Sequence, residues 1–261
     1  MTPPLTLTGI ESPSLGTQGD GAGPAFELKF LLDDKQAQEV ETWAQRRLAL
    51  DAHGDPALGG AYRTTSLYCD TPELDVYHRS PLYRRRKFRL RRYGSALSVF
   101  LERKSKWGDR VAKRRTLVSE VELPLLADPL SMPAWSGHWF HDGLLQRRLL
   151  PACRIVYERT AYVGTCAEGP LRLTLDRCPR GILTEEWAVA PFDGGLPLLT
   201  GQVIMELKFR SALPAPFKEL VQVMKLNPGC ISKYRLCREA FFGRFSEPGQ
   251  TGATLGEAAD G

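Results

Sequence analysis

Residues 87–93 read Lys-Phe-Arg-Leu-Arg-Arg-Tyr, and their alternating pattern indicates the type of fold. Cationic side chains fall on positions 87, 89 and 91, with apolar side chains between them. A period of two is that of a β-strand, so the charged residues would share one face of a sheet. The alternation returns in Glu102 and Lys104; Tyr157 and Arg159; Arg172, Thr174 and Asp176; and Glu206 and Lys208. Such cationic faces would repel one another unless they surrounded a strong anion, which predicts a chain of phosphates as the ligand.

The composition limits the class of protein. The chain has 261 residues, 43% of them hydrophobic, enough for one large domain or two small ones. The net charge of +5 is modest and the positive charge is concentrated in residues 84–92, unlike a polycation that coats nucleic acid. Six cysteines show neither a Cys-x-x-Cys pair nor zinc-ligand spacing, so we expect free thiols in a reducing cytosol. No segment has the pattern of a membrane span or a signal peptide, which predicts a soluble, cytoplasmic protein.

The pattern along the chain predicts one α+β domain over residues 25–245, between a disordered leader at 1–24 and a disordered tail at 246–261. Strands are expected at 26–32, 62–69, 86–93, 97–105, 111–123, 152–164, 170–177 and 201–210. Helices are expected at 34–50, 72–80, within 128–151 and at 215–225, before a last segment at 231–242. Eight strands with mostly short connections predict an antiparallel β-barrel with peripheral helices.

The cationic segments also have plainer interpretations. The run from Arg84 to Arg92 could be a solvated face or a nucleic-acid patch. Glu27 and Glu206 could be surface ion-pair partners, which contribute little. These alternatives are less convincing when the segments are considered together. Each would then require several independent strands to be basic on the same inward face without a ligand. The sequence has no Gly-x-x-x-x-Gly-Lys-Ser/Thr loop, so side chains would have to hold the phosphates.

Eight short motifs occur in a fixed order between Phe26 and Arg238. They are Phe26-Glu27-Leu28-Lys29-Phe30; Ser66-Leu67-Tyr68-Cys69-Asp70-Thr71 with Tyr77; Arg89-Leu90-Arg91-Arg92-Tyr93; Leu101-Glu102-Arg103-Lys104; Tyr157-Glu158-Arg159-Thr160-Ala161; Arg172-Leu173-Thr174-Leu175-Asp176; Met205-Glu206-Leu207-Lys208-Phe209; and Ser232-Lys233-Tyr234. In these motifs the chain resembles the polyphosphate polymerase (VTC) domain of the triphosphate tunnel metalloenzyme superfamily, in its short bacterial form. The resemblance implies an eight-stranded antiparallel tunnel with basic walls.

The resemblance also implies a role for each matching residue. Phosphates would be held and activated by Lys29, Arg89, Arg91, Lys104, Arg159, Arg172 and Lys233. Further substrate contacts would come from Lys113, Tyr157, Lys208 and Ser232. Glu206 would hold a divalent metal, Mn²⁺ or Mg²⁺. Ala25 stands where the related CYTH branch has the first glutamate of Glu-x-Glu-x-Lys, which favours the polymerase branch.

The expected reaction is transfer of the γ-phosphate of ATP onto a growing inorganic polyphosphate chain, with release of ADP. The expected partners are ATP, polyphosphate and pyrophosphate or triphosphate, without nucleic acid; any membrane coupling would need a separate protein. Two alternatives stay open. One is a hydrolase that cleaves triphosphate or polyphosphate in the same tunnel, and the other is a non-catalytic module that binds polyanions. The sequence indicates no oligomeric state.

Overall fold

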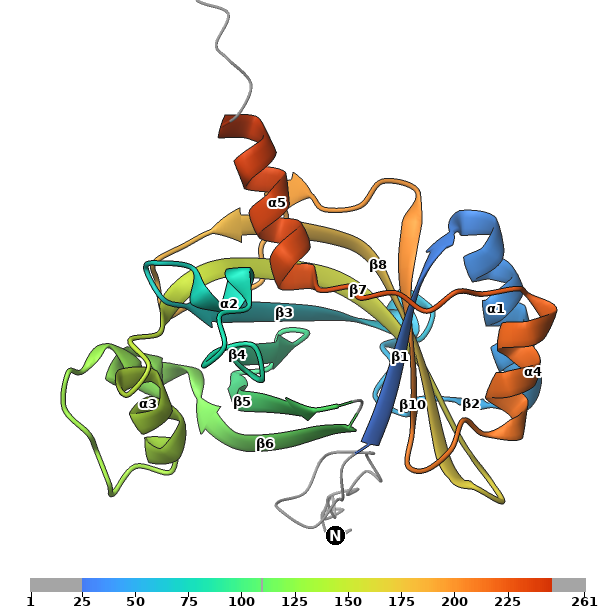
Figure 1. Ribbon diagram of the computed structural model, residues 1–261, viewed down its shortest axis with the longest axis horizontal. Coiled ribbons are helices and arrows are strands. Elements are labelled where there is room, and N and C mark those ends of the chain that lie inside the picture. The colour runs from blue at the N-terminus through green and yellow to red at the C-terminus, as the bar shows by residue number, and fades with distance from the viewer. Residues whose placement is uncertain (1–24, 109, 246–261) are drawn as a thin grey trace, which may run out of the picture.

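The strands of the protein form one closed ring (Figure 1). The computed structural model describes residues 25–108 and 110–245. Within them ten strands make one sheet, in the order β2-β7-β3-β4-β5-β6-β1-β10-β8-β9. Because β7 also pairs with β8, the eight long strands close into an antiparallel barrel, and β2 and β9 add two residues each at its rim. The predicted eight-stranded barrel is confirmed, whereas the predicted leader and tail lie outside the described residues.

The elements follow one another along the chain with short connections. The strands are β1 (Ala25–Asp33), β2 (Ala49–Leu50), β3 (Ala61–Asp70), β4 (Arg86–Tyr93), β5 (Ser98–Trp107), β6 (Arg110–Ser119), β7 (Leu150–Cys166), β8 (Gly169–Leu183), β9 (Leu196–Pro197) and β10 (Gln202–Phe209). The helices are α1 (Asp34–Arg47), α2 (Asp75–His78), α3 (His138–Leu145), α4 (Ala215–Val223) and α5 (Lys233–Phe245), with 3-10 helices η1 (Pro56–Leu58) and η2 (Glu120–Ala127). None of the described helices has the length and apolar composition that crossing a bilayer requires.

Apolar side chains lie on the outside of the barrel, beneath the helices. One core joins Leu67 of β3 and Leu90 of β4 to Phe140 of α3. A second core lies on β1, β8 and β10 and includes Val40 of α1 and Phe217 of α4. Figure 1 shows α1 and α4 together on one side of the barrel and α3 on the other. Since successive side chains of a strand alternate between faces, the polar positions of the same strands point into the barrel.

The predicted strand at residues 111–123 is too long, because β6 ends at Ser119. The Glu122 carboxylate accepts a hydrogen bond of 2.7 Å from the Ser119 N–H, and the chain continues as η2. Ser-x-x-Glu is a helix-start signal that is present in the sequence. The signal therefore outweighs the strand pattern at this point.

Other predicted boundaries also change. The helix predicted at residues 72–80 is confined to α2, and in 128–151 only α3 is α-helical before β7 begins at Leu150. β8 continues to Leu183, beyond the predicted end at 177, because it keeps pairing with β7 past a register shift between Val156 and Glu158. Long-range pairing thus extends strands that local patterns end early.

A buried carboxylate fixes the start of α5. Asp70, at the end of β3, accepts hydrogen bonds from the backbone N–H groups of Thr71 at 2.8 Å, Val76 at 2.7 Å and Tyr77 at 2.9 Å. The Tyr234 hydroxyl donates to the same carboxylate. Hydrogen bonds to a charged acceptor are the stronger kind. Asp70 therefore holds the first turn of α5 at one end of the barrel.

Replacement of this carboxylate tests the anchor. We expect Asp70→Asn to lower the free energy of unfolding by about 2 kcal/mol, because the amide has one acceptor oxygen and turns an NH₂ group toward N–H donors. Urea denaturation measures the change, with the exposed Asp193→Asn as control. Equal denaturation midpoints for the two variants would show that Asp70 is not an anchor.

The ring is closed least firmly between β1 and β6. Among the described residues these strands are paired at Ala25 with Val111 and at Phe26 with Arg110. Inside the barrel, the Lys104 ammonium of β5 crosses to the Glu27 carboxylate of β1 with contacts of 2.8 and 2.9 Å. A short ladder and an ion pair therefore complete the barrel here.

Candidate functional site

The inward face of β4 runs from one end of the barrel to the other. Lys87 lies beside the start of α5, where its Nζ donates to Ser232 Oγ at 3.1 Å. Arg89, Arg91 and Tyr93 follow at intervals of two, and so share the inward face. Lys87 therefore marks the end of the barrel next to α5, called the α5 end below, and Tyr93 marks the opposite end.

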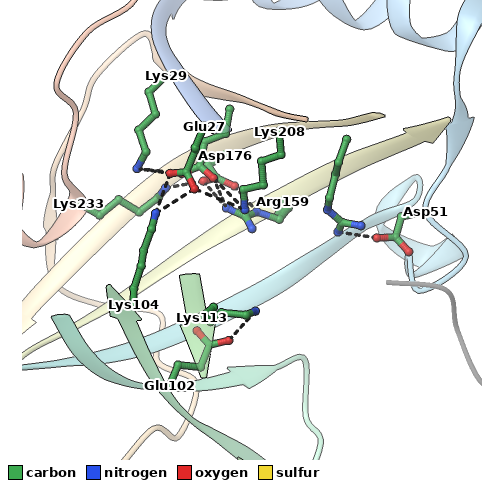
Figure 2. A network of polar contacts seen from close by, with 12 residues as sticks. Glu27, Lys29, Asp51, Glu102, Lys104, Lys113, Arg159, Asp176, Lys208 and Lys233 are labelled. Carbon is green, nitrogen blue, oxygen red and sulfur yellow. Dashed lines mark hydrogen bonds and ion pairs between the residues drawn. The ribbon is translucent and has the colours of Figure 1, made fainter. Parts of the chain in front are cut away.

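The barrel brings the residues assigned from the sequence together. All lie on the inward side of the strands or at the start of α5: Lys29, Arg89, Arg91, Lys104, Lys113, Tyr157, Arg159, Arg172, Glu206, Lys208, Ser232 and Lys233. Figure 2 shows many of them converging from different strands. This placement is what a common ligand would require, and their individual roles stay predictions.

Two carboxylates on neighbouring strands, Glu27 of β1 and Glu206 of β10, share lysine partners. Lys29 Nζ lies 3.4 Å from Glu27 and 3.0 Å from Glu206. Lys208 Nζ lies 4.0 Å and 3.4 Å from the same two residues, and Lys104 approaches Glu27 to 2.8 Å. Burial, and for Glu27 the charge of Glu206, would raise the pKa of these carboxyls. The ammonium groups outweigh this and hold both pKa values below the usual range, so both carry a negative charge.

A third carboxylate, Asp176 of β8, is fully buried and binds two cations. Arg159 donates two hydrogen bonds to it, at 2.6 and 2.7 Å, and Lys233 of α5 donates a further one. Burial opposes its ionisation, but Arg159 and Lys233 lower its pKa. The Tyr157 ring faces both cations, with its centroid 5.4 Å from the Arg159 guanidinium carbon and 4.5 Å from Lys233 Nζ. This cluster ties α5 to the barrel wall.

Two more carboxylates hold cations farther along the barrel. Glu102, also fully buried, pairs with Arg89 at 2.7 Å and Lys113 at 3.1 Å. Arg172 pairs with Asp51 at 2.6 Å, and Figure 2 shows Asp51 apart from the cluster around Glu27. The interior of the barrel is thus partly neutralised by its own acidic side chains.

Among the inward cations, Lys87 and Arg91 form no ion pair with a carboxylate in the described part of the chain. Lys87 donates to the Ser232 hydroxyl, and the Arg91 guanidinium donates to Ser66 Oγ at 3.1 Å. Arg91 is only 4% exposed. A buried charge without a counter-charge costs free energy, which a bound anion would recover. These two positions are therefore suited to an anionic ligand.

Three buried hydroxyl groups on the inward face, those of Thr64, Tyr157 and Thr174, also lack a hydrogen-bond partner among residues 25–108 and 110–245. Thr64 lies directly across from Tyr157, and Thr174 lies directly across from Glu206. Buried polar groups are nearly always hydrogen-bonded. Phosphate oxygens are acceptors that these hydroxyls could donate to, so the interior offers donors as well as positive charge to a phosphate chain.

The Lys87 side chain can change its protonation state near neutral pH. Burial, with the charges of Lys29 and Lys104, lowers its pKa to about 7. At pH 8 the free protein therefore holds Lys87 largely neutral. A phosphate bound beside it would favour the ammonium form and raise its pKa, so binding would draw a proton from solution, and the affinity would fall as the pH rises above 7.

Calorimetry can detect this proton. We expect triphosphate binding at pH 8 to take up more protons in the wild type than in Lys87→Met, as judged from binding heats in two buffers of different ionisation enthalpy. The exposed Lys35→Met, on α1, is the matched control and should behave as wild type. The same proton count in wild type and Lys87→Met would mean that phosphate does not bind near Lys87.

The Glu27–Glu206 pair fits a divalent metal that is shared with a phosphate ligand. Within the described residues no group of three or more His, Cys, Asp or Glu side chains is placed to hold a metal. Mg²⁺ is commonly bound by one or two carboxylates together with substrate phosphates, and two neighbouring carboxylates meet that requirement. The resemblance implied Glu206 alone as a metal ligand, and Glu27 is a second carboxylate that contacts the same lysines.

The sequence pattern placed Lys87, Glu102 and Asp176 on the charged face of the strands but gave them no role in the site, and it allowed Glu27 to be a surface ion-pair partner. In the structure all four lie inside the barrel, as the period of two indicates. Glu27, Lys87 and Glu102 each stand two positions from an assigned residue, and Asp176 stands four positions from one. Because every second residue of a strand shares a face, this spacing identifies more of the interior residues than the motifs alone.

Solved structures match this chain at low sequence identity. A search of curated proteins finds no match to the chain. Among solved structures, a candidate adenylate cyclase from Bacillus halodurans is 13% identical, covers 79% of this chain and 92% of its own, and has a TM-score of 0.50. A candidate adenylyl cyclase from Hippeastrum, described as having a dominant triphosphatase activity, is 13% identical, with coverages of 84% and 96% and a TM-score of 0.47. A Pyrococcus horikoshii OT3 protein is 14% identical, with coverages of 83% and 99% and a TM-score of 0.45.

The likeness to the Bacillus halodurans structure concerns the fold alone. The family is given by sequence, because a model of the VTC domain matches residues 25–242. That match spans every strand of the barrel and reaches into α5. The chain therefore belongs to the VTC domain family.

Proposed function

We propose that this protein is a metal-dependent polyphosphate polymerase that transfers the γ-phosphate of ATP onto inorganic polyphosphate inside the barrel. Membership of the VTC domain family and the closed fold support an enzyme acting on phosphates. The observation that carries the proposal is the unbalanced interior. Lys87 and Arg91 lack carboxylate partners in the described chain, and three buried hydroxyls lack acceptors. Phosphates would satisfy both deficits.

The chemistry needs position and charge more than a strong base. A terminal oxygen of the polyphosphate forms a bond to the γ-phosphorus while the bond from that phosphorus to the bridging oxygen breaks, and ADP leaves with that oxygen. The attacking oxygen is already anionic near neutral pH. Arg89, Arg91 and Arg159 would neutralise the phosphoryl oxygens, because guanidinium groups stay charged and can bind two oxygens at once.

Glu206 and Glu27 would hold Mn²⁺ or Mg²⁺, which when bound neutralises charge on phosphate oxygens. Lys29 and Lys208, which pair with these carboxylates, would then be released to bind phosphate. Lys104, Lys113, Arg172 and Lys233 would hold the rest of the chain, with Tyr157 and Ser232 as hydrogen-bond donors. We place this activity in the cytoplasm, where ATP is plentiful, and expect any movement of the product across a membrane to need another protein.

The proposal is tested by the product. Purified protein incubated with ATP and Mn²⁺ should give a ladder of long polymer on a polyacrylamide gel stained for polyanions, and Lys233→Ala should lose it. Release of phosphate without polymer would instead identify a hydrolase of the same fold. Neither product, with triphosphate still bound, would leave a module that only binds polyanions.

A further inference from the structure

Three aromatic side chains meet at the end of the barrel opposite α5. They are Tyr62 of β3, Tyr93 of β4 and Phe100 of β5, here called the aromatic collar. The ring centroids of Tyr62 and Tyr93 lie 5.7 Å apart, and those of Tyr93 and Phe100 lie 5.8 Å apart. Both contacts are edge-on, with interplanar angles of 77° and 67°. The three rings come from consecutive strands of the sheet and form one continuous row.

The aromatic collar belongs to the inward face and not to the cores under the helices. Tyr93 pairs across the sheet with Thr64, whose buried hydroxyl has no hydrogen-bond partner in the described part of the chain, and Arg91 pairs with Phe100. Tyr93 and Phe100 are half-buried, and the collar rings are absent from both core clusters described above. Cross-strand partners share a face, so these rings continue the row that begins with Lys87.

Cations border the aromatic collar on the side of the phosphate-binding residues. Arg172 donates to the Tyr62 hydroxyl at 3.2 Å, and the Arg91 guanidinium carbon lies 6.0 Å from the centre of the Tyr93 ring. Arg115 stacks over Phe100 at 4.4 Å. On β4 the inward face thus changes from the Arg91 guanidinium to the Tyr93 ring between one inward position and the next, and Arg172 and Arg115 place cations beside the other two rings. A ligand that spans this change must be anionic at one end and flat and apolar at the other.

We propose that the aromatic collar is the binding site for the base of a nucleoside triphosphate, so that the nucleotide occupies the end of the barrel opposite α5. The inference rests on the proposed function, which requires a nucleotide donor but does not say where its base binds. Aromatic side chains bind nucleobases by stacking, and every base offers a π-face. The collar should accept purine and pyrimidine nucleotides with little preference.

This placement assigns the donor nucleotide and the acceptor chain to opposite ends of the barrel. With the base at the aromatic collar, the α-, β- and γ-phosphates extend past Arg91 and Arg172 toward Arg159 and Glu206. The acceptor chain then occupies the α5 end, beside Lys87 and Lys233. Donor and acceptor meet in the middle, where Glu206 and Arg159 lie 3.9 Å apart.

The experiment compares two ligands that differ by a nucleoside. Calorimetry in EDTA, where metal-dependent turnover is stopped, measures the affinities for ATP and for inorganic triphosphate. Tyr93→Ala and Phe100→Ala are expected to weaken ATP binding about tenfold, a typical loss for one stacked base, and to change triphosphate binding less than twofold. Tyr93→Phe and Phe100→Tyr keep a ring and should bind ATP as the wild type does. Phe242→Ala removes an aromatic ring from α5, outside the collar, and is the matched control.

The outcomes distinguish a failure of the proposed base-binding site from a failure of the proposed function. An equal loss for ATP and triphosphate would mean that the collar only supports the barrel wall, and no loss for ATP would put the base elsewhere. Either result overturns the inference while leaving the polymerase proposal standing. If the alanine variants do not fold, Tyr93→Leu and Phe100→Leu keep the bulk without the π-face and should show the same selective loss. Failure of wild-type protein to bind triphosphate at all would instead count against the proposed function.

Discussion

Glu206→Gln is expected to reduce polymer synthesis by about 100-fold or more while the protein still binds triphosphate. The amide removes one of the two carboxylates that would hold the metal and keeps the shape of the side chain. It also frees Lys29 and Lys208 from an ion pair, since their ammonium groups lie 3.0 and 3.4 Å from the Glu206 carboxylate. Triphosphate affinity without metal should therefore stay the same or increase. Turnover is measured as polymer formed at saturating Mn²⁺, and binding by calorimetry in EDTA.

The control for this change is Glu158→Gln. Glu158 is exposed on β7, so the same chemical replacement is made outside the barrel and should leave turnover unchanged. Normal rates in Glu206→Gln would remove the metal role from this residue. A parallel loss of triphosphate binding would point instead to a general collapse of the interior.

Asp176→Asn should destabilise the ligand-free protein by about 3 kcal/mol or more, because it leaves Arg159 and Lys233 buried without a counter-charge. Triphosphate supplies new negative charge and should restore much of this loss. At a concentration of 100 times Kd, mass action alone adds about 2.7 kcal/mol. Thermal unfolding with and without millimolar triphosphate measures both effects, and the rise in Tm with ligand should be present in the wild type as well.

Two further measurements sharpen the Asp176 prediction. Adding Lys233→Met to Asp176→Asn removes one of the unpaired cations and should recover part of the lost stability, as a double-mutant cycle would reveal.

The pH dependence of stability should also differ between the wild type and Asp176→Asn. Asp176 has a pKa below its ordinary value of 3.8 in the folded protein, so its contribution is complete above that value and is lost as the pH falls through the lowered pKa. The acid unfolding of Asp176→Asn should accordingly be shallower than that of the wild type. Equal stability of wild type and variant at pH 7 would contradict the role of this ion pair.

The barrel could be predicted from the sequence because its polar face is marked strand by strand. Lys87, Arg89, Arg91 and Tyr93 alternate without interruption, and β4 has the predicted boundaries. In β7 the register with β8 shifts between Val156 and Glu158, and no local pattern announces such a shift. The end of β6 was missed for a different reason. The Ser119-x-x-Glu122 helix-start signal follows directly on a β-type alternation, so the strand pattern alone places the end of β6 too late.

The acidic half of the site was harder to predict. Glu27 resembles a surface ion-pair partner in its own segment, and only ring closure brings Lys104 of β5 to within 2.8 Å of it. The aromatic collar arises differently, because Tyr62, Tyr93 and Phe100 become neighbours through the register of β3, β4 and β5, which follow one another along the chain. Alternation gives the face of a residue, whereas register and closure decide which residues share a ligand.

The internal carboxylates have a consequence for what the barrel can select. An anion that enters must first separate cations from Glu27, Glu102 and Asp176, and this cost is set by the protein and not by the size of the ligand. A single orthophosphate offers too few oxygens to reach more than a few of the separated cations. Each added phosphate unit contacts further cations, so the gain grows with the chain while the initial cost stays nearly fixed. The barrel would thus act as a length filter, in which abundant small anions of the cell compete poorly with oligophosphates.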